Sequence, residues 1–336
     1  FQLLFNPLVG VLSSGCCAIL KPSPEAPHIA ELMEKMIKEI YPEEYITVVH
    51  GAKEENQLLF KKRFDHIFFT GSPRLGKIVM KAAAEFLTPV VLELGGKSPC
   101  IVDKSANIEI SAKRIAWSKT INAGQTCIAP DYILVHASIK EELIKKIEHY
   151  WIEMFGENPL HSEYYPRIVN DDAFDRLHAL LENGTLRVGG DSDKENRYIQ
   201  PTILDDINLE DPIMKEEIFG PILPIISFKE LSEALNTIDT FEKPLALYYY
   251  GASSSSKEVM LKTSSGGACI NDGLLQNANH HLPFGGVGSS GTGVYHGHES
   301  FLCFSNKKAI IHSPTWIDLP FKYVPFKWFH WIKKII

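Results

Sequence analysis

Residues 89–96 read Pro-Val-Val-Leu-Glu-Leu-Gly-Gly, an apolar run that ends in a carboxylate and two glycines. Apolar residues with little alternation predict a strand buried on both faces, which is typical of a parallel sheet. Earlier in the chain, predicted strands alternate with predicted helices. The strands are expected at 17–20, 46–49 and 66–69, and the helices at 26–40, 53–63 and 75–86. This alternation predicts an α/β fold with a doubly wound, Rossmann-like sheet.

Glycines follow three of these predicted strands, at Gly51, Gly71 and Gly95. In open α/β sheets, ligands bind beyond the carboxyl ends of the strands, where glycine lets the backbone approach closely. We therefore expect a ligand site along this edge of the sheet.

The rest of the chain repeats the alternation, and its 336 residues suffice for two domains. Helices are expected at 108–121, 139–155, 171–182 and 230–238, and strands at 132–135, 222–226 and 246–250. Residues 264–297 are rich in Gly, Ser and Asn, which favours a long irregular segment lining a site.

The overall composition excludes several classes of protein. The net charge is −7 without a long Lys/Arg block, so no nucleic-acid partner is expected. The six cysteines form no C-x-x-C pair and no zinc pattern, which favours free thiols in a reducing, cytoplasmic compartment. No leader and no spanning apolar run are visible.

The sequence Gly124-Gln125-Thr126-Cys127 holds the candidate nucleophile, about one turn beyond a predicted helix. A cysteine in apolar surroundings is more often an inert packing residue. Three further strings distinguish this one. They are Glu93-Leu-Gly-Gly-Lys-Ser-Pro99, Glu216-Glu-Ile-Phe-Gly-Pro221 and Pro283-Phe-Gly-Gly-Val-Gly-Ser-Ser-Gly291.

Together these four strings resemble the aldehyde dehydrogenase superfamily, most closely its class 3 branch, which includes the fatty aldehyde dehydrogenases. The resemblance runs from Phe1 to about Ser305. It implies an NAD(P)-binding domain over 1–94 that lacks its N-terminal part, and a catalytic domain over 95–294. Residues 295–336 would form a return segment and a tail. The implied reaction is oxidation of a medium- or long-chain aldehyde to its carboxylic acid, by a homodimer.

The resemblance also assigns the catalytic residues. Cys127 matches the nucleophile, whose adduct with the aldehyde passes hydride to nicotinamide and leaves a thioester. Glu93 matches the general base that activates water to hydrolyse this thioester. Burial should bring its pKa closer to neutrality, which suits a base working at neutral pH. The alternative for Glu93 is a surface ion pair.

Further positions match cofactor contacts. Lys21 matches a lysine at the adenosine ribose, and Gly71, Ser72 and Gly76 match a turn into a helix whose amides hold the pyrophosphate. Leu94 lies in the same region of the family's site.

At the nicotinamide end, Glu217 matches the acid that holds the ribose, and Phe219 packs near the same end. Asn271 and the 285–291 loop resemble segments that line the site, in roles either structural or binding.

Two departures from the family pattern affect these expectations. Pro24 stands where the family usually has a ribose-binding Glu, so NADP is expected to be possible besides NAD. The family's Trp-Asn-x-Pro motif, whose Asn stabilises the oxyanion, is absent from this sequence. One donor of this kind is typically worth ~10²–10³ in rate. A catalytically impaired fragment acting as a binding protein is therefore the rival hypothesis. A second rival is transfer of the acyl group to CoA, against which Glu93 argues.

The last residues and the histidines raise two further questions. Residues 316–336 interleave aromatic residues with lysines, which suits the surface of an intracellular membrane; the alternative is that the aromatics fold back on the protein or onto a partner. His280-His281 and His296-Gly297-His298 suggest no third ligand nearby, so no metal site is expected.

Overall fold

The computed structural model describes residues 1–319, 322–325, 330 and 333–334. It divides into two units, residues 1–304 and residues 305–336, and each is described by itself. In the part of the chain that the structure describes, every helix is too short or too polar to span a lipid bilayer.

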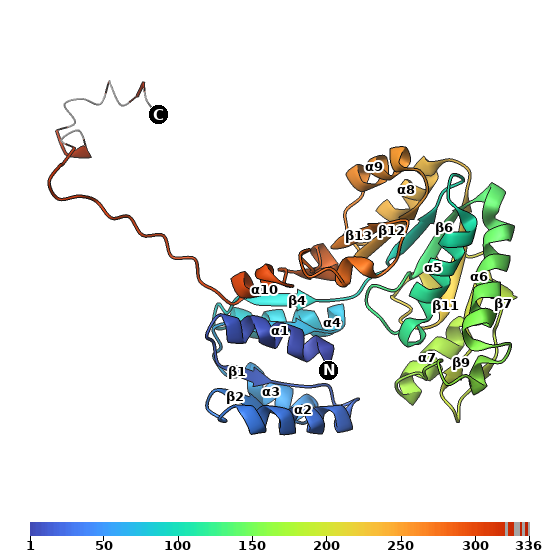
Figure 1. Ribbon diagram of the computed structural model, residues 1–336, viewed down its shortest axis with the longest axis horizontal. Helices are drawn as coiled ribbons and strands as arrows, with labels where there is room; N and C mark the ends of the chain where they lie inside the picture. The colour runs from blue at the N-terminus through green and yellow to red at the C-terminus, as the bar shows by residue number, and fades with distance from the viewer. Residues whose placement is uncertain (320–321, 326–329, 331–332, 335–336) are drawn as a thin grey trace. The chain divides into compact units, whose positions relative to one another are not determined.

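The N-terminal third of the first unit contains two small sheets flanked by helices (Figure 1). Strands β1 (Ala18–Leu20) and β2 (Ile46–Val48) pair in parallel, as do β3 (Ile67–Thr70) and β4 (Val90–Glu93). The short β14 (Gly291–Thr292) pairs antiparallel with β4. The helices here are α1 (Gln2–Ser13), α2 (Pro27–Ile40), α3 (Lys53–Phe60) and α4 (Pro73–Ala84).

Seven strands form the main sheet of the same unit, in the order β13-β12-β5-β6-β11-β10-β7. All neighbours are parallel except β7, which runs antiparallel to β10. The strands span β5 (Pro99–Val102), β6 (Tyr132–His136), β7 (Thr185–Val188), β10 (Thr202–Asp205), β11 (Ile222–Phe228), β12 (Ala246–Tyr250) and β13 (Gly267–Ile270). A separate hairpin pairs β8 (Ser192–Asp193) with β9 (Tyr198–Ile199).

The helices α5 (Ile108–Thr120), α6 (Lys140–Phe155), α7 (Asp171–Leu180), α8 (Leu231–Asp239) and α9 (Ser253–Lys262) accompany this sheet. Helix α10 (His298–Cys303) instead packs against α1 (Figure 1). The apolar strands divide their side chains between two cores, one on each face of the sheet. Tyr248 and Tyr250 face one core while Tyr249 faces the other, as the period of two in a strand requires.

The predicted α/β class is confirmed, and most predicted elements lie within a few residues of their expected positions. The predicted helix at 53–63 ends earlier, at Phe60, and the one at 75–86 begins earlier, at Pro73. The segment 264–297 is not wholly irregular, because it contains β13 at the edge of the main sheet and β14 beside β4.

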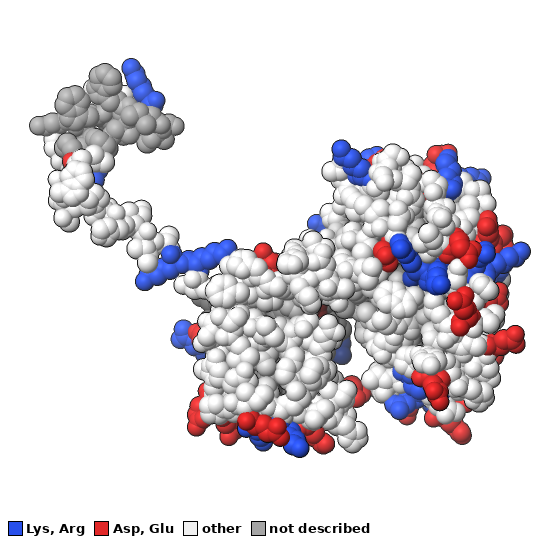
Figure 2. All heavy atoms as spheres, viewed as in Figure 1, with Lys and Arg blue, Asp and Glu red and all other residues white. Residues whose placement is uncertain are grey.

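Lys and Arg side chains lie among Asp and Glu on the visible face of the first unit, with no broad area of one sign (Figure 2). In the second unit, Trp316 is 83% exposed and Tyr323 is half exposed. Phe321, Phe326, Trp328, Phe329 and Trp331, which contribute to the predicted aromatic tail, lie outside the described residues.

Candidate active site

The structure brings Glu93, Cys127 and Glu217 near one another. Glu93 is the last residue of β4, so it lies at the carboxyl end of that strand. The segments that carry Cys127 and Glu217 instead precede β6 and β11, so they lie at the amino ends of neighbouring strands in the main sheet. The small sheet therefore contributes the carboxyl end of a strand, as expected for a ligand site. The main sheet instead contributes the amino ends of its strands.

Glu93 is a buried carboxyl group. Its residue is only 3% exposed, and neither side-chain oxygen has a hydrogen-bond partner. Burial raises the pKa of Glu93 to about 8, the direction expected for a base working near neutrality. The alternative of a surface ion pair does not describe this side chain.

Cys127 follows α5 and a short 3₁₀ helix at Ile121–Gly124. Asn122 and Ala123 have positive φ values of 52°, which turn the chain sharply after α5. Burial, with smaller contributions from Glu217 and Glu93, raises the pKa of the Cys127 thiol to about 12. The resting thiol is therefore mostly protonated at neutral pH, and it must lose its proton before it can act as a nucleophile.

Glu217 lies against the glycines that follow β4. A Cβ atom at Gly95 would collide with the carboxylate of Glu217, so only glycine leaves room for this packing. Burial, with a smaller contribution from Asp131, raises the pKa of Glu217 to about 8. Phe219, two residues later, has a φ of 50° and is 39% exposed, so a strained turn presents its ring to solvent.

The predicted pyrophosphate turn is a capped helix N-terminus. Ser72 caps α4, and its hydroxyl accepts a hydrogen bond from the backbone N–H of Leu75 at 3.4 Å. Gly76 lies in the first turns of α4, where an added Cβ would come within 2.8 Å of Leu94. Gly71 donates its N–H to the carbonyl of Glu93 at 3.0 Å, so this turn and the end of β4 are in register.

Lys21 follows β1, and its Nζ donates to the carbonyl of Gly51 at 2.6 Å, which joins the carboxyl ends of β1 and β2. Glu25 does not turn toward this lysine. Its Oε2 accepts a hydrogen bond from Nδ2 of Asn170 at 3.0 Å.

Two further buried residues, for which no role was predicted, lie near the candidate site. Tyr295 is buried, and burial raises the pKa of its hydroxyl, with smaller contributions from Glu93 and Cys127. Lys119 is 1% exposed, donates to the carbonyl of Pro130 at 3.0 Å, and burial lowers its pKa to about 8. Lys119 lies four residues after the buried Ile115, so both fall on the same face of α5. This position in the helical repeat is the sequence signal that could have predicted the burial of Lys119.

Asn271 has a structural role in the described protein. Its side chain exchanges two hydrogen bonds with the backbone of Gly251, at 2.8 and 3.0 Å. The 285–291 loop also has a structural contact with the end of β4. Gly291 is opposite Glu93 in the β14–β4 ladder, and the Ser290 carbonyl accepts a hydrogen bond from the backbone N–H of Leu94 at 3.0 Å.

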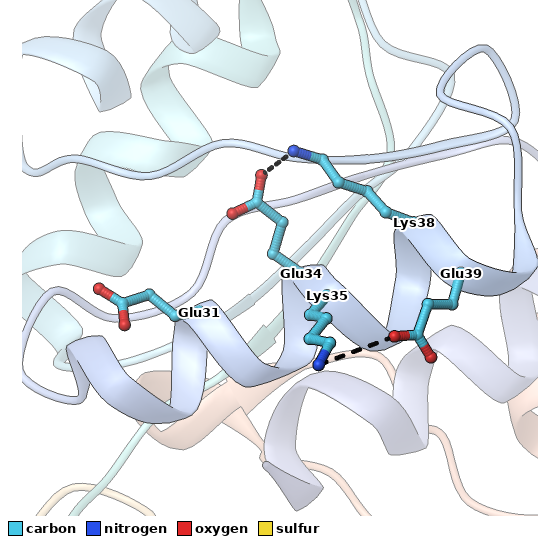
Figure 3. A pocket seen from close by; sticks show the side chains of 5 residues that line it. All are labelled: Glu31, Glu34, Lys35, Lys38 and Glu39. Atoms are coloured by element: carbon cyan, nitrogen blue, oxygen red, sulfur yellow. Dashed lines mark ion pairs between the residues drawn. The ribbon is translucent and has the colours of Figure 1, made fainter.

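Two further features carry no site. Among the described residues, no three His, Cys, Asp or Glu side chains are grouped so that they could hold a metal ion. A shallow hollow along α2 is lined by Glu34–Lys38 and Lys35–Glu39 ion pairs of 2.6 and 4.0 Å (Figure 3). Such exposed i,i+4 pairs are ordinary on solvated helices.

Comparisons with known proteins agree with this architecture. The sequence pattern of the Aldehyde dehydrogenase family matches residues 1–310. The 4,4'-diaponeurosporen-aldehyde dehydrogenase of Staphylococcus aureus is 46% identical over 97% of this chain and 72% of its own length. The dimeric NADP-preferring aldehyde dehydrogenase of Rattus norvegicus is 45% identical, over 93% of this chain and 69% of its own. Aldehyde dehydrogenase family 3 member B1 of Homo sapiens is 47% identical, over 93% and 67% respectively.

Two solved structures share the fold. The substrate-bound state of Staphylococcus aureus AldH has a TM-score of 0.96 at 45% identity, covering all of this chain and 74% of that one. The Mycobacterium tuberculosis aldehyde dehydrogenase complexed with NAD⁺ has a TM-score of 0.85 at 27% identity, covering 94% and 67%.

The fold and these relatives define an NAD(P)-dependent oxidoreductase that acts on aldehydes. The chain belongs to the aldehyde dehydrogenase family, in its class 3 branch. The predictions of fold, family, reaction and cofactor class are confirmed.

Proposed function

We propose that Cys127 is the nucleophile and Glu93 the general base of a hydrolytic aldehyde dehydrogenase. The supporting observation is the pair of unpartnered, buried oxygens on Glu93, within electrostatic range of the Cys127 thiol. A buried polar atom without a partner is costly unless a ligand or water completes it. The substrate water of thioester hydrolysis is a group of this kind.

The proposed reaction has two halves. The thiol of Cys127 releases its proton to solvent water, and its sulfur bonds to the aldehyde carbon, whose oxygen takes the electron pair of the opened C=O bond. The hydrogen on that carbon leaves as hydride, and a thioester remains. Glu93 then takes a proton from water, the hydroxyl oxygen bonds to the acyl carbon, and the carbon–sulfur bond breaks to release the acid. The bound nicotinamide cofactor supplies the hydride acceptor.

The chain's residues fit such a cofactor at two ends. The Glu217 carboxyl, which packs against Gly95, would accept hydrogen bonds from ribose hydroxyls, and Phe219, two residues later, would offer a partly exposed ring to the nicotinamide end. At the other end, the amides at the start of α4 behind Ser72 suit a pyrophosphate.

The remaining cofactor assignments are proposals of the same kind. Gly71 and Gly76 let the backbone and α4 approach the cofactor, Leu94 lies against Gly76, and Lys21 contacts the adenosine ribose. Both NAD and NADP are proposed as cofactors, because Pro24 offers no carboxylate to repel a 2′-phosphate and the Glu25 carboxylate is held by Asn170.

The domain limits are also proposed: cofactor binding over 1–94, catalysis over 95–294, and a return segment with tail over 295–336. The change from the small sheets to the seven-stranded sheet between β4 and β5 supports the first limit. Six free cysteines support a reducing compartment such as the cytoplasm. A homodimer is proposed by analogy with the dimeric Rattus norvegicus relative.

The proposed substrate is a medium- or long-chain aliphatic aldehyde. A hollow of about 420 Å³ opens beside the segment that leads into Cys127. Trp117 and Ile121 border it, and they are 38% and 40% exposed. Apolar side chains at the rim of this hollow suit an alkyl chain.

Chain-length dependence tests the substrate proposal. From butanal to decanal, kcat/KM for NADH formation should rise by about fourfold per methylene while the chain still gains burial, since each buried methylene is worth ~0.8 kcal/mol. Trp117→Ala should flatten this rise, and Trp316→Ala, in the second unit, should leave it unchanged. A kcat/KM that is independent of chain length would refute the proposal.

The tail is proposed to contact a membrane surface. Trp316 and Tyr323 are exposed, as interfacial anchors need to be, and Nζ of Lys322 lies 4.8 Å from the centroid of the Tyr323 ring. The intact chain should therefore sediment with vesicles that contain anionic lipid, and a chain ending at Ser313 should stay in the supernatant. Equal partitioning of the two chains would contradict the membrane contact.

A further inference from the structure

Asp131 lies where the three chain segments that carry Glu93, Cys127 and Glu217 come together. It lies four residues after Cys127, and its side chain contacts the segments that follow Glu93 and Glu217. We propose that Asp131 is a positioning residue that fixes the nucleophile segment relative to the segments of the base and the ribose-binding acid. The inference rests on the proposed function, because it takes these three residues as the site.

Both carboxylate oxygens of Asp131 are engaged, each by a different segment. Oδ2 accepts a hydrogen bond from Nζ of Lys97 at 2.5 Å, and Oδ1 accepts one from the backbone N–H of Ile218 at 2.9 Å. The backbone N–H of Asp131 also donates to the carbonyl of Ser98 at 2.8 Å. Lys97 is four residues after Glu93, and Ile218 directly follows Glu217.

Lys97 completes the connection. Besides Asp131, its ammonium group donates to the carbonyls of Ile213 at 2.8 Å and Glu216 at 3.1 Å. All three of its protons can therefore be placed, and two of them bind the segment that carries Glu217. The acid is thus held from both sides, through Glu216 and Ile218.

The sheet explains why these groups meet. Lys97, Asp131 and Ile218 precede β5, β6 and β11, which are three consecutive neighbours in the main sheet. Parallel strands bring their amino ends to one edge, so the three entry segments lie side by side. One carboxylate can therefore bridge all three.

Because both partners are buried, the geometry of the Asp131–Lys97 contact is tightly constrained. Asp131 is 3% exposed and Lys97 is 7% exposed. In such surroundings an unpaired charge is poorly solvated, so each partner needs the other in a fixed geometry. A displacement of Asp131 would be passed to Cys127 through three intervening residues.

The simpler alternative is that the pair only stabilises the fold. The chain offers a matched control for it in Asp205 of β10, which is 4% exposed and pairs with Lys140 at 2.8 Å and Arg187 at 2.7 Å. Its partners come from α6 and β7, which hold no proposed site residue.

The experiment compares Asp131→Asn with Asp205→Asn in the full chain. It measures the melting temperature, the Kd for NAD⁺, and the rate of Cys127 alkylation by iodoacetamide against pH. Both variants should melt below wild type. Only Asp131→Asn should raise the Kd for NAD⁺ and change the rate of Cys127 alkylation at a given pH, each by roughly tenfold or more. Effects of this size are expected because misplacing a site group by about 1 Å can cost ~100-fold.

A second variant covers the case in which Asp131→Asn does not fold. The double variant Lys97→Met/Asp131→Leu removes both charges and refills the space, a change that buried pairs often tolerate. It should fold yet bind NAD⁺ weakly, because the Ile218 N–H has lost its acceptor. Wild-type NAD⁺ affinity and alkylation in either Asp131 variant would overturn the proposal.

The result separates this inference from the proposed function. If the wild-type chain bound no NAD⁺, or if Cys127→Ser left NADH formation unchanged, the proposed function would fail. The alkylation comparison would still decide whether Asp131 positions Cys127.

Discussion

Replacing Cys127 by serine should abolish NADH formation from a fatty aldehyde, with a loss of at least ~10³-fold in kcat/KM. The change substitutes one atom in a half-buried side chain, so the fold and the binding of NAD⁺ should survive. A hydroxyl ionises far less readily than a thiol, and the carboxyl groups nearby already oppose ionisation at this position. The loss should therefore appear in the chemical step, measured as the absence of a rise in NADH absorbance.

Cys17→Ser is the matched control, because Cys17 is exposed and lies outside the proposed site. It should retain wild-type activity and lose only its reactivity toward thiol reagents. Turnover in Cys127→Ser, or its loss in Cys17→Ser, would show that the nucleophile had been wrongly assigned.

Replacing Glu93 by glutamine should separate the two halves of the reaction. The first turnover should still release one NADH per active site, because Glu93 is not needed for hydride transfer. Steady turnover should then fall by ~10²–10⁴-fold, the usual range for loss of a general base. Stopped-flow measurement of NADH resolves the burst from the steady rate, and equal loss of both phases would contradict the role given to Glu93.

The pH dependence gives an independent check on the same residue. A base with a pKa of about 8 is mostly protonated at pH 7, so steady turnover should rise with pH and level off above about 8. Glu93→Gln should remove this rise.

Stability should respond to pH in the opposite direction. Burial holds the pKa of Glu93 in the folded protein above its ordinary value of 4.5. The stabilisation that the protonated carboxyl contributes to the fold is therefore fully present below pH 4.5 and is lost as pH rises through about 8. The free energy of unfolding of the glutamine variant should therefore exceed that of wild type at pH 8, by on the order of 2–4 kcal/mol, and the two should converge near pH 4.5.

The fold could be read from the sequence where its elements had strong patterns. The apolar strands and the amphipathic helices α2 and α6 are examples, because a buried face imposes a period that the residues display. Helix α9 was not predicted, since it begins with Ser253-Ser-Ser-Ser256, and serine in isolation favours caps and turns over helix interiors. Packing of Val259 against the sheet outweighs that preference.

The candidate site could be predicted as residue types but not as an arrangement. The strings around Glu93, Cys127 and Glu217, through their resemblance to the aldehyde dehydrogenase family, implied a base, a nucleophile and an acid. It could not show that Asp131 joins their segments, because the order of β5, β6 and β11 in the sheet is a tertiary property. Nor could it show that the resting thiol has a raised pKa, which depends on burial and on the charges that folding brings near.

The central claim is that an acyl group becomes attached to Cys127 and that Glu93 promotes its removal. The most direct measurement is mass spectrometry of digested Glu93→Gln chain after incubation with NAD⁺ and decanal. The peptide that contains Cys127 should carry the mass of a decanoyl group, in an amount equal to the NADH burst. A burst that leaves this peptide unmodified, or a decanoyl group on another cysteine, would contradict the account.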